Sequence, residues 1–342
     1  MNSKEVIRRV IEHDSPCRIG HDFSKCSNDI SWVSGVRFIE NDNQKLRLRN
    51  WGRHIEILKK VPDFNGEVME DVVGNIYGRF EGKTKGECIK GIISDGWENL
   101  DLYSIPEIDI NYYEEMKDRK YADSDKYILS SFPFSVFSNL RDARLMHNAL
   151  MDTAIDTENI AKFLDKICEK SLQVIEGLSR TGCNAIIMAD DWGTQDRTFI
   201  SPESFREIFK PAYKVIADAL HKVNMKFMLH SCGCIYEFID DMIDAGIDVF
   251  QFDQVEVYGS EVLAREFGDR ATFYSSVDIQ KVLPTGNREY IEKTALEMAD
   301  NFRNISRGGF IAKDYPSYND INVKEEWADW ARDVFLKNSS IN

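Results

Sequence analysis

His230 and Cys232 stand two residues apart at the end of Lys226–His230, a short apolar run that is typical of a β-strand. Side chains two residues apart along a strand point to the same face, so this imidazole and thiol could share one metal ion. Zinc binds imidazole nitrogen at ~2.0–2.1 Å and thiolate sulfur at ~2.3 Å, distances that such a pair can meet. The competing interpretation is structural, because a cysteine on a buried strand commonly packs as a small hydrophobe.

Four further apolar runs are also followed directly by polar residues. These groups are Asp190–Gln195, Gln251–Gln254, Ser275–Asp278 and Lys313–Tyr315. Any one of them could be a helix cap or a solvated loop, since Asp and Ser commonly precede helices. Together with His230–Cys234, however, five successive groups favour a shared polar pocket. Asp190 and Asp191 are neighbours on a strand and face opposite ways, and we expect Asp191 to face the pocket.

Helical periodicity and short apolar runs alternate from Glu158 to the end of the chain. Helices are expected at Glu158–Arg180, Ser201–Leu220, Ile235–Ala245, Ser260–Phe267, Arg288–Phe302 and Val323–Phe335, and strands at Ala185–Ala189, Lys226–His230, Asp248–Phe252, Thr272–Ser275 and Gly309–Ala312. This order indicates parallel strands with helices outside, either as a barrel or as an open doubly wound sheet. No glycine-rich phosphate motif follows these strands, which favours a (β/α)8 TIM barrel with its active site at the carboxyl ends of the strands.

The first 150 residues have less regular periodicity. Tyr127–Phe137 is expected to be a strand and Arg141–Leu150 a helix. We expect the remaining barrel strands here, with an N-terminal helical extension and long insertions over the barrel mouth. No repeat or Pro/Ser-rich linker divides the chain, so residues 1–342 are predicted to form a single domain.

Composition limits the partners and the compartment. The chain has 43 basic and 58 acidic residues and a formal charge of −15, so nucleic acid and anionic membranes are not expected partners. Its opening lacks the apolar region of a signal peptide, and no run is long enough to span a bilayer. Seven scattered cysteines suit a reducing compartment, and we expect a cytoplasmic protein. The oligomeric state is left open, with a homodimer among the candidates.

The polar groups, in this order, resemble those of the uroporphyrinogen decarboxylase superfamily, and within it the cobalamin-dependent methyltransferases more than the decarboxylases. The resemblance covers about residues 158–335, and the opening segment Ser3–Arg18 also looks like the first helix of that superfamily. The matching stretches are Ala189–Gln195, Ile200–Pro211, His230–Gly233, Phe250–Gln254, Phe267–Phe273, Val277–Gln280 and Gly308–Ile311. Membership implies a (β/α)8 barrel with a cleft at its carboxyl face.

The resemblance also implies a zinc site. In the methyltransferase branch a His-x-Cys pair supplies two zinc ligands, which carry over to His230 and Cys232, and a cysteine near the last strand supplies a third. This chain has no cysteine after Cys234. The third ligand is therefore left open among Cys234, Asp191, Asp253, Asp278 and Asp314. The arginine-rich segment that grips tetrapyrrole carboxylates in the decarboxylases has no counterpart in Arg18–Lys25, which disfavours decarboxylation of uroporphyrinogen.

The resulting hypothesis is methyl transfer between a small methylated substrate and a corrinoid carried on a partner protein. With one thiolate fewer, the site is harder toward oxygen ligands, which favours O-demethylation. We expect Asp191 and Asp314 as acids or further ligands, and Gln195, Gln254 and Asp278 as substrate-binding residues. Trp192 packs either on the substrate or corrinoid or as core in the barrel mouth. The alternatives are a metal-free lyase of the decarboxylase type and a non-catalytic corrinoid-binding relative.

Overall fold

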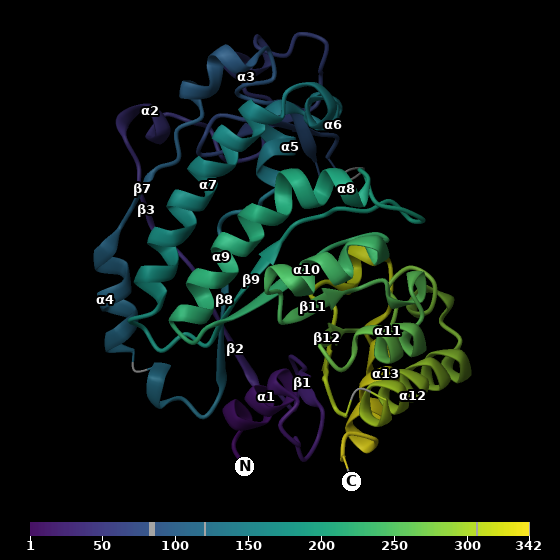
Figure 1. Cartoon of the computed structure of the whole chain (residues 1–342). Coiled ribbons are helices and arrows are strands. Elements are labelled where there is room, and N and C mark those ends of the chain that lie inside the picture. The colour runs from purple at the N-terminus through teal and green to yellow at the C-terminus, as the bar shows by residue number, and fades with distance from the viewer. Residues whose placement is uncertain (82–85, 120, 306, 342) are drawn as a thin grey trace.

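Eight parallel strands form the central sheet of the computed structural model, which describes residues 1–81, 86–119, 121–305 and 307–341. The strands are β1 (Gly20–Asp22), β2 (Ile30–Ser34), β8 (Tyr127–Ser131), β9 (Ala185–Ala189), β10 (Lys226–His230), β11 (Val249–Phe252), β12 (Thr272–Ser275) and β13 (Phe310–Lys313), in the order β1-β13-β12-β11-β10-β9-β8-β2. The sheet curls into a nearly closed barrel, with β1 and β2 at its two edges (Figure 1). The predicted (β/α)8 barrel is therefore confirmed.

From β8 onward, helices on the outside of the barrel follow the strands in alternation, as the sequence predicts (Figure 1). They are α7 (Thr157–Leu178), α8 (Pro202–Ser204), a π-helical turn Phe205–Phe209, α9 (Lys210–Lys222), α10 (Ile239–Ala245), α11 (Ser260–Phe267), α12 (Arg288–Asn304) and α13 (Glu325–Lys337). Their buried residues follow helical spacing, as Ile160, Phe163, Leu164 and Ile167 do on α7. Among the described residues, no helix has both the length and the apolar character needed to cross a membrane.

The N-terminal helix α1 (Ser3–Glu12) closes the amino end of the barrel. Its residues Val6, Ile7, Val10 and Ile11 are buried against apolar side chains from the strands. Gly20 on β1 makes this approach possible, because a Cβ there would lie 2.5 Å from the Cδ1 atom of Ile7. The expected helical extension is thus part of the barrel core.

The segment between β2 and β8 forms two small antiparallel sheets. One contains β4 (Glu67–Glu70), β5 (Ile76–Arg79) and β6 (Glu87–Lys90), and the other pairs β3 (Phe38–Ile39) with β7 (Glu107–Ile108). Short helices α2 (Asp42–Lys45), α3 (Ile55–Leu58) and α4 (Ile110–Asp118) complete it. The segment packs against the helices after β8: the Tyr77 hydroxyl donates to Asp142 at 2.7 Å, and Tyr113 lies against Gly177 of α7.

Two expectations near residue 140 were wrong in detail. The strand expected over Tyr127–Phe137 ends at Ser131, shortly before Pro133, which has no backbone N–H to donate. The helix expected over Arg141–Leu150 is two helices, α5 (Ser138–Arg144) and α6 (Met146–Ile155), separated by Leu145 with φ of 67°. The buried Arg144 side chain, which donates to the Asp152 carboxylate and to the Ile93 carbonyl in the turn after β6, holds this break in place.

Candidate metal centre at the barrel mouth

The strand registers determine which side chains face the barrel interior near its carboxyl end. His230 pairs with Gln251, and Gln251 pairs in turn with Tyr274. Residues two positions earlier, Met228 and Val249, belong to the apolar cluster that α1 seals. Since alternate residues of a strand share a face, His230 and Gln251 point into the same interior, one layer nearer the mouth.

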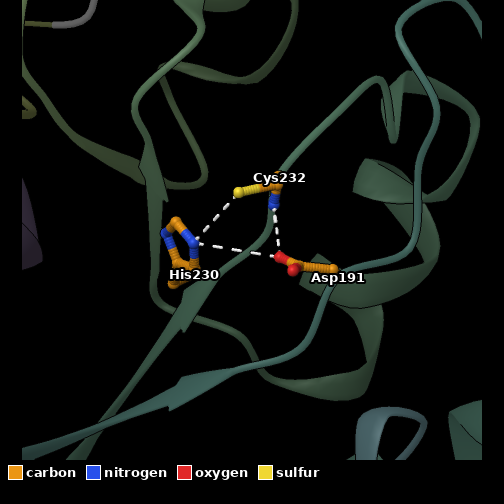
Figure 2. Close-up of side chains that lie close together, drawn as sticks. All are labelled: Asp191, His230 and Cys232. Atoms are coloured by element: carbon orange, nitrogen blue, oxygen red, sulfur yellow. Dashed lines mark hydrogen bonds and ion pairs between the residues drawn. The ribbon is translucent and has the colours of Figure 1, made fainter. Parts of the chain in front are cut away.

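Asp191, His230 and Cys232 come together at this mouth. The Nε2 atom of His230 lies 3.4 Å from Cys232 Sγ and 3.8 Å from Asp191 Oδ1 (Figure 2). One ligand atom from each residue lies within 4.8 Å of the others. Asp191 follows β9, whereas His230 ends β10 and Cys232 follows it, so two adjacent strands position all three. Their side chains are partly exposed and accessible from the mouth.

Backbone contacts hold the loop after β10 in place. The Cys232 N–H donates to Asp191 Oδ1 at 2.8 Å, which orients that carboxylate toward the site. Gly233 has φ of 76°, and a Cβ there would lie 2.2 Å from the Gly193 carbonyl oxygen, so only glycine fits. Its N–H donates to Gln254, and its carbonyl accepts from the Tyr258 hydroxyl at 2.6 Å.

These three side chains fit a zinc ion. Nitrogen, thiolate sulfur and carboxylate oxygen are zinc's usual ligands, and tetrahedral coordination places such atoms about 3.4–3.6 Å apart. The observed separations of 3.4 and 3.8 Å from His230 Nε2 need only small side-chain rotations to meet this. A three-residue set leaves a fourth position for a substrate atom, as in catalytic zinc sites. Of the open choices for the third ligand, Asp191 is the one that the geometry favours.

A line of buried polar side chains continues behind His230. Its Nδ1 atom lies 2.5 Å from Gln251 Oε1, Gln251 Nε2 donates to Asp253 Oδ1 at 2.9 Å, and Lys313 Nζ donates to the same oxygen at 2.8 Å. Burial by itself would raise the pKa of the Asp253 carboxyl, but the Lys313 ammonium, together with His230 and the Gln251 amide, holds that pKa below its ordinary value.

Trp192 lies in the hydrophobic core and not in the pocket. Its side chain is 0% exposed, stacks on Phe137 at 4.2 Å between ring centroids, and donates to the Tyr213 hydroxyl at 2.7 Å. Of the two roles considered for it, this burial favours core packing, and contact with a substrate stays an untested prediction. Its neighbour Asp190 faces the same way, caps α5 by accepting from Phe137 and Ser138, and has a pKa raised by burial.

The other expected site residues lie outside the three-residue cluster. Gln254 and Asp278 are buried and support loops: Gln254 accepts from Gly233, and Asp278 accepts three backbone N–H groups. Asp314 is paired with Arg332 at 2.9 Å and accepts from Ser24. Gln195 is exposed in a turn bounded by the Gly193–Thr198 bridge. Their proposed roles in catalysis or substrate binding remain predictions.

Several residues of the mouth were not assigned a role from the sequence. In the sequence, Gln251 and Lys313 stand out only as members of polar groups, and no pattern singles out Asp22, Trp32 or Tyr274. Tyr274 on β12 and Trp32 on β2 both donate to the Asp22 carboxylate on β1. The sequence pattern that could have identified them is a polar residue at every second position of a short apolar strand. The pairing register between strands, which the sequence does not show, decides which of these residues face the barrel interior.

Comparison with known proteins agrees with this architecture. A family model described as uroporphyrinogen decarboxylase (URO-D) matches residues 129–313, which is more than half of the chain. A methylated-thiol–coenzyme M methyltransferase of Methanosarcina mazei is 25% identical over 164 residues, 48% of this chain and 41% of that protein. The chain thus aligns with less than half the length of this relative. A solved structure of a methyltransferase from Methanosarcina mazei has a TM-score of 0.64 at 15% identity, covering 98% of this chain and 99% of that one.

Proposed function

The chain belongs to the uroporphyrinogen decarboxylase family, and we propose that it is a methyltransferase that moves a methyl group between a small methylated substrate and a corrinoid carried by a partner protein. The Asp191–His230–Cys232 cluster at the open barrel mouth is the observation that carries this proposal. The sequence relative, itself a methyltransferase, supports it.

In this proposal His230, Cys232 and Asp191 hold zinc, which when bound acts as a Lewis acid on the oxygen or sulfur atom that bears the methyl group. The protein's own residues position this centre. The Cys232 N–H fixes the Asp191 carboxylate, and Gly233 lets the loop fold back against Gly193. Because all three side chains face the mouth, a methyl group held there is accessible to a partner docked on the carboxyl face of the barrel.

Demethylation of the substrate transfers its methyl group to the corrinoid without an external oxidant. The bond between the methyl carbon and its oxygen or sulfur breaks, and the electron pair stays on the heteroatom. The methyl group bonds to cob(I)alamin, whose cobalt donates two electrons and becomes formally cobalt(III). The heteroatom then takes a proton from water, so no external oxidant is needed. Stabilising the leaving anion is the main requirement, since an alkoxide is a poor leaving group.

Two substrate classes are supported by different observations. The donor set contains one thiolate with a carboxylate and an imidazole, which favours oxygen ligands and hence methyl ethers or alcohols. The sequence relative is named for methylated thiols, which favours a thioether or thiol. We place methyl ethers and alcohols first.

Metal analysis tests the cluster. We expect about one zinc per chain in the purified protein, and loss of most of it in His230→Ala and Cys232→Ser variants that keep the native circular dichroism spectrum. The control is Gln195→Ala, because Gln195 is exposed and follows the same strand as Asp191. This variant should keep the zinc content of the parent protein. Full zinc in both ligand variants would contradict the assignment.

Turnover is tested with cob(I)alamin and a panel of methyl ethers, alcohols and thioethers. One class should convert the cob(I)alamin spectrum to that of methylcobalamin with the parent protein, and His230→Ala should be at least about 100-fold slower. Methyl transfer is refuted if zinc-loaded protein neither methylates cob(I)alamin from any compound of the panel nor demethylates methylcobalamin with the corresponding alcohols or thiols. Loss of CO2 from a carboxylic acid by metal-free protein would instead support the lyase.

A further inference from the structure

We propose that Gln251 and Asp253 are positioning residues that hold His230 in its Nδ1–H tautomer, with Nε2 free to accept, and that Lys313 keeps Asp253 in place for this task. The proposal rests on the proposed function only in treating His230 as a metal ligand. It concerns side chains behind the metal cluster, on β10, β11 and β13 and in the loop directly after β11.

The hydrogen-bond directions begin at the ion pair. Lys313 Nζ lies 2.8 Å from Asp253 Oδ1, and the two side chains are only 7% and 9% exposed. An ammonium can only donate, and a carboxylate beside it can only accept. Asp253 is therefore a fixed acceptor at the far end of the line.

This acceptor fixes the orientation of the Gln251 amide. The Gln251 atom 2.9 Å from Asp253 Oδ1 must be the NH2 group, because two acceptors in contact would repel each other. Gln251 Oε1 then faces His230 Nδ1 at 2.5 Å, and since this oxygen can only accept, Nδ1 must carry the proton. The hydrogen bonds therefore all point the same way: His230 Nδ1–H donates to Gln251, and the Gln251 NH2 group donates to Asp253.

The consequence appears at the other ring nitrogen. With the proton on Nδ1, the lone pair of a neutral imidazole lies on Nε2, the atom that faces Cys232 Sγ at 3.4 Å and Asp191 Oδ1 at 3.8 Å. The opposite tautomer would point an N–H at these atoms and block coordination. Partners that fix a ligand histidine in this way commonly change metal affinity by about 10–100-fold when they are removed.

Burial and strand pairing make the line rigid. Gln251 is 6% exposed, so bulk water cannot easily replace its amide. His230 and Gln251 are register partners on adjacent parallel strands, which places their side chains next to each other without help from a loop. Lys313 reaches Asp253 over the ring of Tyr274, 5.9 Å from the ring centroid, and this contact further limits its movement.

The direct test is the tautomer in metal-free protein, without corrinoid or methyl donor. Long-range ¹H–¹⁵N spectra of protein labelled at its six histidines, recorded at about pH 8, where an ordinary imidazole is neutral, distinguish the two tautomers. A His230→Asn variant identifies the His230 signals. We expect Nδ1–H for His230 in the parent protein. An Nε2–H signal would overturn the proposal, whether or not any variant folds.

The Gln251→Met variant then tests whether the Gln251 amide is what fixes the tautomer of His230. Methionine keeps the length of the side chain but neither accepts nor donates as the amide does, so we expect His230 to show mixed tautomers and zinc affinity to fall about 10–100-fold. Gln44→Met is the matched control, because Gln44 is also buried but lies in the segment between β2 and β8. An unchanged tautomer and zinc affinity in Gln251→Met would overturn the proposal. If the tautomer is as expected but no methyl transfer is found, the proposed function fails and this inference stands.

Discussion

The two ends of the barrel interior differ sharply although the same strands build both. Near the amino end the inward residues are Met228, Val249 and Ile311, sealed beneath α1. Two positions further along the same strands they are His230, Gln251 and Lys313. The backbone pairing of β10 with β11 and of β13 with β1 is continuous through both layers, so only the side chains change.

The two ends therefore contribute differently: the apolar amino end contributes mainly to the stability of the fold, and the polar carboxyl end carries the candidate site. Apolar burial at the amino end stabilises the fold without needing specific partners. Polar groups at the carboxyl end lose water, and each needs a hydrogen bond or an opposite charge to offset that loss. Gln251, Asp253 and Lys313 provide such partners for one another and leave the metal-facing atoms of His230, Cys232 and Asp191 toward the mouth. Substitutions at the two ends should therefore fail in different ways.

The largest effect on folding is expected from Lys313→Met, at the polar end of the barrel interior. The variant leaves the Asp253 carboxylate buried without its cation, which should lower the free energy of unfolding by about 3–5 kcal/mol. Urea denaturation measures this. The double variant Lys313→Met/Asp253→Leu, which removes the stranded charge, should regain most of the loss. If the single variant is as stable as the parent, the ion pair is not a structural requirement of the mouth.

Ile7→Ala should have the next largest effect, at the opposite end. It removes part of a fully buried side chain from the seal beneath the strands, at an expected cost of about 3 kcal/mol in unfolding free energy. Zinc affinity should be unchanged, because the nearest polar layer is built on the strands and not on α1. Thermal unfolding and zinc titration of the same sample measure both. A parallel loss of zinc would show that the two ends are coupled.

The sequence predicted the apolar framework better than the polar mouth. From Glu158 onward each strand is followed by a periodic helix, so the sequence predicts β9–β13, whereas β1 has only three residues and no helix separates it from β2. The spacing of His230 and Cys232 allowed a shared metal ion but left a structural role open, and the family resemblance was needed to favour the metal. The roles of Gln251 and Lys313 could not be predicted, because they depend on the register between strands that are distant in sequence. Trp192 follows a strand like the site residues, but it turns outward into the layer between sheet and helices.

Trp192→Phe tests whether Trp192 belongs to the hydrophobic core or to the mouth, and its expected effect on the free energy of unfolding is smaller. Phenylalanine keeps an aromatic ring against Phe137 but loses volume and the bond to the Tyr213 hydroxyl, so unfolding should become easier by about 2 kcal/mol. The KM for the methylated substrate should not change, since the side chain is fully buried. A raised KM with unchanged stability would place Trp192 at the substrate.

Gln195→Ala should have the smallest effect, and it tests how far the mouth extends. Gln195 follows the same strand as Asp191 but lies on an exposed turn, so its loss should change the free energy of unfolding by less than about 0.5 kcal/mol. If the polar pocket ends at the metal cluster, kcat and KM should also stay at the parent values. A several-fold rise in KM at unchanged stability and zinc content would show that the turn closes over the substrate, and that the region of chemistry extends beyond the barrel strands into the loop after β9.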